Sequence, residues 1–314
     1  MTRKKAVLIS GGGSWGAYGG GTLARLNRDY NTVVGISTGA IMSPLVALKK
    51  WDSLKEAYTT INRHTIFDRK WYKPTPITKK GKLNKLSILL TLLLGQKSVG
   101  TSTNLRKEID RFFPKSYFDR LKYSYKEIFI GVQNLAQNPS DIHYFNNIET
   151  EYEDFKDWMW CSANFPFFTS LVKKGWYDKE SKFHVGLWSD GGLSKLVGFD
   201  ALHSHRYKEV DIILHKTKFE NKYEDYIVNN LMDNITTSVN AMQYNIEFSY
   251  FKDEINKLLS KGTTVNVYWL PRKLSTNSMF FNRNKMLEWW NEGYETAFDL
   301  NRREVYKPRK KSRD

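Results

Sequence analysis

A glycine-flanked serine near the start of the chain is the residue best suited to covalent chemistry. Residues 35–39 read Gly-Ile-Ser-Thr-Gly, which fits the pattern G-x-S-x-G. In that pattern a serine occupies a tight turn between a strand and a helix, and its hydroxyl is exposed as a nucleophile. Gly35 and Gly39 would let the strand and the helix approach each other without Cβ clashes. We therefore predict Ser37 as a nucleophile on an elbow formed by Gly35 and Gly39.

A run of three glycines follows the apolar segment at residues 5–10. Unhindered backbone N–H groups at the end of a strand suit an oxyanion hole or a phosphate cradle. Gly11, Gly12 and Gly13 are the candidate donors. The spacing also fits a dinucleotide-binding pattern that ends at Gly16, but it lacks the Lys-Ser/Thr pair of a P-loop. The next unit carries the serine turn where an acidic ribose ligand would be expected, so we favour the oxyanion hole.

A carboxyl group stands before two further glycines at Asp190-Gly191-Gly192, after a short apolar stretch at residues 185–188. An Asp-Gly pair by itself is typical of a hairpin or an Asx turn. Its value lies in its combination with the two glycine-rich segments near the start of the chain.

Together the three segments resemble the patatin-like phospholipase family, whose pattern is G-G-G-x-[RK]-G, then G-x-S-x-G, then a distant D-G-G or D-G-A. Residues 160–168 and 128–134 resemble two weaker family segments, and the resemblance extends over roughly residues 5–215. It implies a Ser37–Asp190 dyad that forms an acyl-enzyme, with Gly191 and Gly192 as a supporting turn. It also implies a phospholipase A-type or lysophospholipase activity on lipid carboxylic esters, with no cofactor and no metal.

Two departures qualify the resemblance. Trp15 occupies the position where the family has Arg or Lys, and residues 193–196 replace the usual Asn- and Pro-containing run, so the far wall of the site is expected to differ. Trp15, together with the basic stretches at residues 69–107 and 302–314, suggests an alternative, a catalytically retired patatin scaffold that binds anionic lipid or nucleic acid. The acyl chain, the headgroup and the ester position of a lipid substrate are not specified by the sequence.

The histidines favour a dyad over a triad. In the chain order Ser-Asp-His, only His203, His205 and His215 follow Asp190. The first two lie in a segment rich in Lys and Arg, which is typical of a surface. They could form half of a metal site, but no Cys or further His stands nearby in the sequence to complete it. We therefore predict a structural role for these histidines and no metal site.

The surrounding sequence predicts an α/β fold. Strand, glycine turn and helix occur twice within the first fifty residues, which is the opening of a parallel sheet. We expect strands at residues 5–10, 32–34, 125–132, 185–188, 211–214 and 265–270, and helices at 17–26, 40–50, 154–163, 221–259 and 285–300. With the family resemblance, these elements predict a three-layer sandwich with a mainly parallel central sheet flanked by helices. We assign residues 1–300 to one domain and 301–314 to a basic, disordered tail.

The net charge of +16 is concentrated in two stretches. Residues 69–107 contain ten Lys or Arg and no Asp or Glu, and residues 302–314 contain seven basic residues and two acidic ones. Such regional charge favours a polyanionic partner, either an anionic membrane surface or nucleic acid, although no base-reading motif supports the latter. Residues 86–94 hold seven aliphatic side chains between lysines. They predict either a core helix or a membrane-binding lid within an insertion at 69–107.

Cysteine content and hydropathy bear on the compartment. Cys161 is the single cysteine, so the chain has no intramolecular disulfide. The apolar run after the basic N-terminus is too short for the core of a signal peptide, and no run reaches the roughly 20 residues that span a bilayer. We expect a cytoplasmic protein with peripheral membrane association, and we make no prediction of its oligomeric state.

Overall fold

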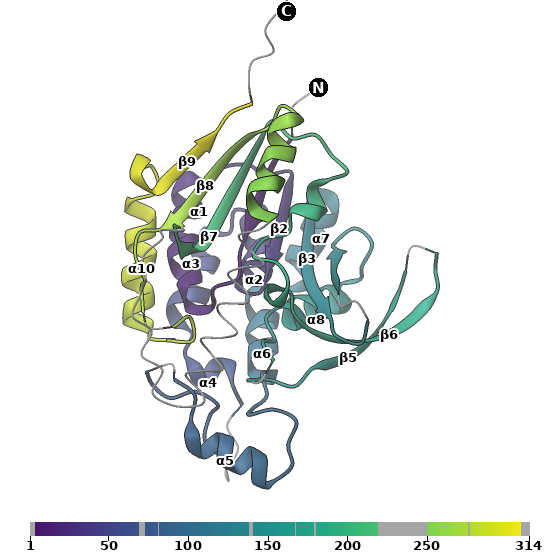
Figure 1. The fold of residues 1–314 in the computed structure, drawn as a ribbon, viewed down its shortest axis with the longest axis vertical. Helices are drawn as coiled ribbons and strands as arrows, with labels where there is room; N and C mark the ends of the chain where they lie inside the picture. Colours follow the sequence, from purple (N-terminus) through teal and green to yellow (C-terminus); the bar gives the residue numbers. More distant parts are fainter. Residues whose placement is uncertain are drawn as a thin grey trace, which may run out of the picture.

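A nine-stranded mixed sheet runs through the computed structural model, which describes residues 4–68, 73–80, 82–137, 141–166, 168–178, 180–218, 250–275 and 277–308 (Figure 1). The strands are β1 (Lys5–Ile9), β2 (Thr32–Ile36), β3 (Glu127–Asn134), β4 (Asp141–Asn146), β5 (Val172–Tyr177), β6 (Phe183–Asp190), β7 (Glu209–Thr217), β8 (Thr264–Leu270) and β9 (Arg303–Tyr306). Their order is β5-β6-β3-β2-β1-β7-β8-β9, and β4 also pairs with β3. The five strands from β3 to β8 in this order are parallel, whereas β4, β5, β6 and β9 pair antiparallel.

Helices cover both faces of the sheet, as the alternating side chains of β1 show. Val7 and Ile9 belong to the cluster that includes most of the helices, whereas Ala6 and Leu8 pack with η3 (Phe199–Leu202) and the helix at residues 250–260. The remaining helices are α1 (Gly16–Leu26), α2 (Thr38–Ala47), α3 (Trp51–Thr60), α4 (Arg63–Ile66), α5 (Lys85–Leu93), α6 (Thr103–Phe112), α7 (Lys115–Tyr123), α8 (Tyr152–Ser162) and α10 (Arg283–Glu295). The predicted α/β sandwich is confirmed.

The register of β3 brings the ends of two other strands together. β4 takes one edge of β3, while β2 and β6 share the other edge. Ile36, the last residue of β2, lies opposite Gly131, and Asp190, the last residue of β6, lies opposite the next residue, Val132. Because β6 runs antiparallel to β3 and β2 runs parallel to it, the carboxyl ends of β2 and β6 face each other. Ser37 and Asp190 therefore meet at one point of the sheet.

Each predicted strand is present, but the sequence did not predict β4, β5 and β9 or most of the helices between β2 and β3. Other differences lie near the C-terminus. α10 ends at Glu295 instead of residue 300, and the predicted helix at 221–259 lies outside the described residues except for the helical part at 250–260. Residues 303–306, which we expected in a disordered tail, form β9 at the edge of the sheet. Arg303 donates a hydrogen bond to Asn266 Oδ1 on β8, and Glu304 pairs with Lys218. The basic composition of this stretch favoured a disordered tail in the sequence analysis, although four of its residues form a short strand.

The basic stretch at 69–107 contains two different structures. α6 begins at Thr103 and packs into the core through Leu105 and Ile109. α5 lies instead at the lower end of the molecule, away from the sheet and opposite β9 (Figure 1). Within the described part of the chain, no helix has the length and apolar content needed to cross a membrane.

Candidate active site

Ser37 occupies a sharp turn between β2 and α2. Its backbone has φ 56° and ψ −122°, a left-handed conformation that L-residues avoid and that is held only where the surroundings fix it. Its N–H donates to Ser162 Oγ at 2.9 Å. The flanking glycines are required by close packing, because a Cβ on Gly35 would lie 2.3 Å from Gly39 O and one on Gly39 would lie 2.2 Å from Ile9 O.

The hydroxyl of Ser37 donates directly to Asp190. Ser37 Oγ lies 2.6 Å from Asp190 Oδ2, and Gly192 N–H donates to the other carboxyl oxygen at 2.8 Å. The turn after Asp190 fits tightly against β3, since a Cβ on Gly191 would lie 2.6 Å from Gly131 O. The structure thus brings together the predicted serine, the predicted aspartate and its supporting turn.

The carboxyl group of Asp190 is 4% exposed. Burial raises its pKa to about 7, because removing a carboxylate from water disfavours the charged form. The hydrogen bonds from Ser37 and from Gly192 N–H act in the opposite direction, because both donors stabilise the charged form. A carboxyl group with this pKa can accept and return a proton near neutral pH.

Two polar residues at the end of α8 connect the serine to the aspartate, and their roles were not predicted. Ser162 Oγ donates to Gly131 O at 2.6 Å while it accepts the Ser37 N–H. Asn164 O accepts the N–H of Asp190 at 3.1 Å and the hydroxyl of Ser189 at 2.9 Å. Both lie in the segment 160–168 that carried part of the family resemblance. That segment was the available signal for these roles.

The glycine loop between β1 and α1 lies against the serine turn. A Cβ on Gly11 would be 3.0 Å from Ser37 Cβ, and one on Gly12 would be 2.3 Å from His215 Cβ. Gly13 has φ +50°, and its carbonyl accepts the hydroxyl of Thr38 at 2.9 Å. Among the hydrogen bonds of the described residues, none uses the N–H of these three glycines. Gly11 is the member of this loop that packs directly against Ser37.

A segment distant in sequence fastens this loop from outside. Ser278 O accepts both the N–H and the hydroxyl of Ser14, at 2.8 Å and 2.9 Å. The indole N–H of Trp15 donates to Ser275 Oγ at 2.8 Å. At the position where the family carries a cation, this chain therefore has a neutral hydrogen bond to the segment between β8 and α10. Nothing in the local sequence pattern indicated these partners.

The three candidate histidines are engaged elsewhere in the described structure. His203 pairs with Glu254 at 2.9 Å and His205 with Glu127 at 3.3 Å. His215 is fully buried behind the glycine loop, where its Nδ1 lies 2.9 Å from Ser10 O, and burial lowers its pKa to about 4. The aspartate itself takes the place next to Ser37 Oγ that a histidine would occupy in a triad.

One cluster of potential metal ligands lies outside this site. Asp200, His203 and Glu254 have ligand atoms within 4.8 Å of one another. Lysines already pair with both carboxylates, Lys195 with Asp200 and Lys257 with Glu254. These ammonium groups supply the positive charge that an ion would bring.

Comparison with known proteins agrees with this geometry. Residues 7–203 match the patatin-like phospholipase family. The chain belongs to this family. The crystal structure of VipD from Legionella pneumophila is similar over 98% of this chain and 68% of that one, with 14% identity and a TM-score of 0.45. A comparison with curated proteins returns no match.

Membership of the patatin-like phospholipase family supports a lipid ester hydrolase. The matched residues include the glycine loop, the serine turn and the Asp190-Gly191-Gly192 turn. They end before β8, so Ser275 and Ser278, which fasten the glycine loop, lie outside the matched range.

Proposed function

We propose that the protein cleaves carboxylic esters of lipids through a Ser37–Asp190 dyad and an acyl-enzyme. The observation that carries the proposal is the 2.6 Å hydrogen bond from Ser37 Oγ to a buried carboxyl group. An ordinary aspartate is too weak a base for a hydroxyl, whereas a carboxyl group with a pKa of about 7 is matched to neutral pH. The phospholipid or lysophospholipid nature of the ester is part of the proposal.

In the first step Ser37 Oγ attacks the ester carbonyl carbon while Asp190 Oδ2 takes the hydroxyl proton. The tetrahedral intermediate collapses when the bond to the alcohol oxygen breaks, and Asp190 returns the proton to that oxygen. In the second step water attacks the acyl-enzyme, and Asp190 accepts a proton from the water. Ser37 leaves with that proton when the fatty acid is released.

The negative charge on the carbonyl oxygen needs fixed donors in both steps. The N–H groups of Gly11, Gly12 and Gly13 are the candidates, because their loop packs against the serine turn through Gly11. The positive dipole end of α2, which begins directly after the serine, adds to their effect. Mutagenesis of other hydrolases assigns about 3 to 4 kcal/mol to one such donor. The loop must be rigid for this purpose, and the bonds to Ser278 and Thr38 hold it.

Labelling with a fluorophosphonate probe tests the proposal directly. The probe should modify the wild-type protein at Ser37, and Ser37→Ala should remain unlabelled. Hydrolysis of a short soluble ester and of a phospholipid should be lost in the same variant. An unlabelled wild-type protein that still binds lipid would instead support the catalytically retired scaffold.

A further inference from the structure

α5 is oriented opposite to an ordinary surface helix. Its buried residues are Ser87, which is 0% exposed, and Thr91, which is 6% exposed. Its leucines point outward, and Leu92 and Leu93 are 74% and 72% exposed. An amphipathic helix normally directs its apolar side chains to the core. The expectation of a core helix at residues 86–94 is therefore not met.

Hydrogen bonds hold the polar side of α5 against the protein. Ser87 Oγ lies 3.2 Å from Pro74 O and 3.3 Å from Val99 O, which belong to the segments on either side of the helix. Thr91 Oγ1 donates to Ser87 O, and Asn84 caps the first turn. The two contacts of Ser87 attach the polar side of α5 to the neighbouring segments, and the other two stabilise the helix itself. The leucine patch, as we name it, consists of Leu86, Leu89, Leu92, Leu93 and Leu94.

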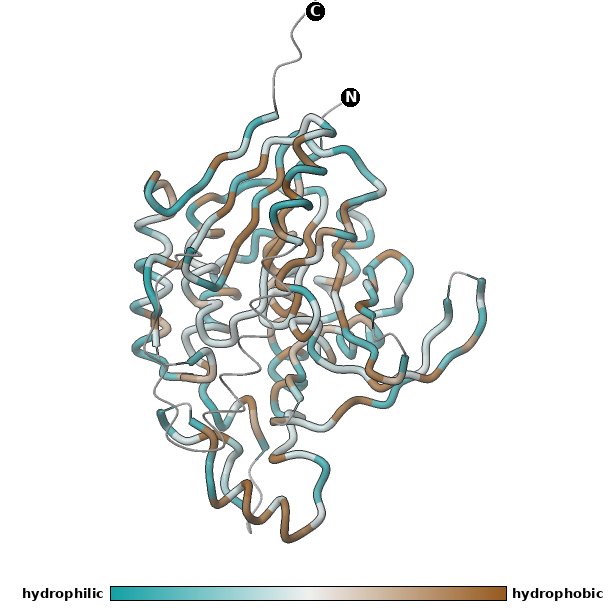
Figure 2. The backbone as a smooth tube through the Cα atoms, in the orientation of Figure 1, coloured by the Kyte–Doolittle hydropathy of each residue, from teal (hydrophilic) through white to brown (hydrophobic). Residues whose placement is uncertain are grey.

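Exposed lysines surround the leucine patch. Four of them precede it or stand at its start, and one follows it: Lys79, Lys80, Lys82, Lys85 and Lys97. No Asp or Glu occurs between residues 69 and 107 of the sequence. Figure 2 shows the apolar helix at the lower end of the molecule, next to hydrophilic segments. Apolar side chains flanked by cations match the chemistry of a bilayer surface, where acyl chains lie beneath anionic headgroups.

We propose that the leucine patch docks the protein on an anionic lipid bilayer. The leucines would enter the acyl region while the five lysines meet the headgroups. Burial of the exposed leucines and the attraction of the lysines to an anionic surface would both stabilise the bound state. Nucleic acid explains the lysines but leaves the leucines exposed, so the observations favour lipid. This docking concerns a surface away from the reacting pair and does not require that Ser37 be active.

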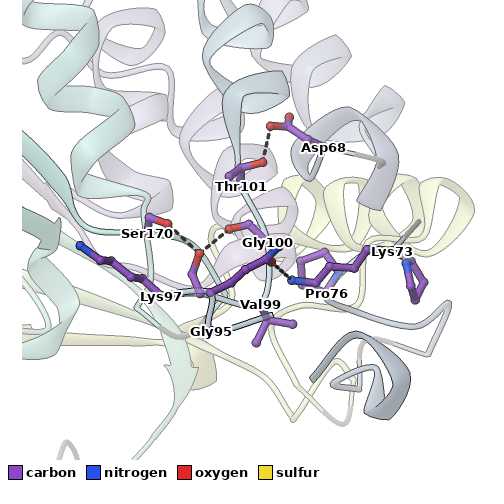
Figure 3. Close-up of a pocket in the computed structure, with 12 residues that line it drawn as sticks. Asp68, Lys73, Pro76, Gly95, Lys97, Val99, Gly100, Thr101 and Ser170 are labelled. Carbon is purple, nitrogen blue, oxygen red and sulfur yellow. Dashed lines mark hydrogen bonds between the residues drawn. The ribbon is translucent and has the colours of Figure 1, made fainter. Parts of the chain in front are cut away.

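The docking surface is connected to the candidate active site by short contacts. Ser98 Oγ lies 2.7 Å from Ser170 Oγ (Figure 3). Gly100 also pairs with Thr169 in an isolated bridge. Ser102 Oγ donates to Asn164 Oδ1 at 2.5 Å, and Asn164 in turn accepts the N–H of Asp190. The segment that follows α5 is therefore linked through Asn164 to the backbone of Asp190.

A cavity of about 330 Å³ lies where the segment after α5 meets the rest of the protein. Lys73, Lys97 and Ser170 are among its lining residues, and Ser37 and Asp190 are not (Figure 3). The cavity thus belongs to the base of α5 and is separate from the reacting pair.

Co-sedimentation with vesicles tests the docking surface on the full chain carrying Ser37→Ala, so that no vesicle lipid is hydrolysed. The vesicles are phosphatidylcholine alone and an equal mixture with phosphatidylserine. We expect binding to the mixture and little binding to phosphatidylcholine alone. Changing Leu89, Leu92 and Leu93 together to Ser should weaken binding about 100-fold or more, given the free energy of burying three leucines. Changing Lys79, Lys80, Lys82 and Lys85 to Gln should weaken it at least about tenfold.

A matched variant on another exposed apolar surface serves as the control. Phe183, Val185 and Leu187 alternate on the exposed side of β6, and their change to Ser should leave vesicle binding intact. Thermal unfolding should give the same melting temperature for the α5 variants as for the parent. Undiminished vesicle binding by the leucine variant would overturn the proposal. A lowered melting temperature of the leucine variant would also overturn it, because it would place the leucines in the core. A third contrary outcome is a dimeric wild-type protein that the leucine substitutions convert to monomers without loss of vesicle binding.

Discussion

The corner between β2 and β6 buries a carboxyl group, whereas α5 exposes a row of leucines. Asp190 is 4% exposed and Leu92 is 74% exposed, so both regions depart from ordinary burial, in opposite directions. At the corner, donors from Ser37 and Gly192 stabilise the buried carboxylate. On α5, the buried Ser87 and Thr91 have hydrogen-bond partners, whereas Leu92 and Leu93 remain mostly exposed. The polar groups of the corner are paired within the protein, whereas the exposed leucines of α5 would be covered only by a partner such as the proposed bilayer.

Ser37→Ala should produce the largest loss of esterase activity, and its effect should be limited to the corner. Loss of the nucleophile should lower kcat at least about a thousandfold, because removal of a nucleophile leaves only binding and oxyanion stabilisation. Vesicle binding through α5 should be unchanged. Ser53→Ala on α3 is a matched control and should keep full esterase activity. Esterase assays and co-sedimentation give both readouts, and residual activity near the wild-type level would exclude Ser37 as nucleophile.

Asp190→Asn should abolish activity and at the same time stabilise the fold above neutral pH. The folded pKa of about 7 lies above the ordinary aspartate pKa of 3.8, so the stability contributed by the protonated carboxyl group is present below pH 3.8 and is lost as the pH rises through 7. The neutral amide avoids this loss, which is on the order of a few kcal/mol, and it can still accept from Gly192 and donate to Ser37.

Thermal unfolding at about pH 8 and pH 4 checks the sign of this effect. Asn should raise the melting temperature at the higher pH, where the wild-type carboxyl group is charged. The difference should nearly disappear at the lower pH. A variant less stable than wild type at the higher pH would show that burial of the charge costs little, and the contrast with α5 would weaken.

Activity should follow the ionisation of the same carboxyl group. The base must be deprotonated to accept the serine proton, so kcat/KM should rise with pH through about 7 and then level off. Initial rates on a neutral, soluble ester measure this profile without interference from vesicle charge. The α5 lysine variant should show the same profile, and a shifted midpoint in it would mean that the two regions are electrostatically coupled.

Trp15→Phe should have the smallest effect, since it removes one hydrogen bond outside the reacting groups. We expect kcat to fall about tenfold with little change in KM, because a loosened glycine loop affects donors used in the transition state. Ser275→Ala should give a similar loss, and the double variant should lose no more than either single variant. Additive losses would show that the two side chains act independently.

Local patterns in the sequence were sufficient for six of the nine strands and for the residues of the corner, but not for β4, β5 and β9. Gly35, Gly39 and the three-glycine loop identify turns that other residues cannot form, and the family resemblance joined them to Asp190. The glycine pattern did not reveal the packing constraint that requires glycine at position 12. The sequence suggested room for a substrate carbonyl, whereas in the structure a Cβ there would lie 2.3 Å from His215 Cβ.

Features that depend on distant segments were not predictable in this way. β6 pairs with the same edge of β3 as β2, beginning where β2 ends. This arrangement depends on sheet register, which the periodicity of the sequence does not specify. The bonds from Ser275 and Ser278 to the glycine loop connect residues more than 250 positions apart. At residues 86–94, seven aliphatic side chains in nine favour burial, and the distant partners of Ser87, Pro74 O and Val99 O, are on the polar side of the helix.

Cys161 gives the molecule a practical property. It is the chain's single cysteine, it is buried in α8, and burial raises the pKa of its thiol. A thiol held protonated and away from solvent reacts slowly with maleimides and iodoacetamides. A cysteine introduced at Leu89 would therefore be the one position labelled by an environment-sensitive dye. Its emission would report contact between α5 and a bilayer during a single turnover.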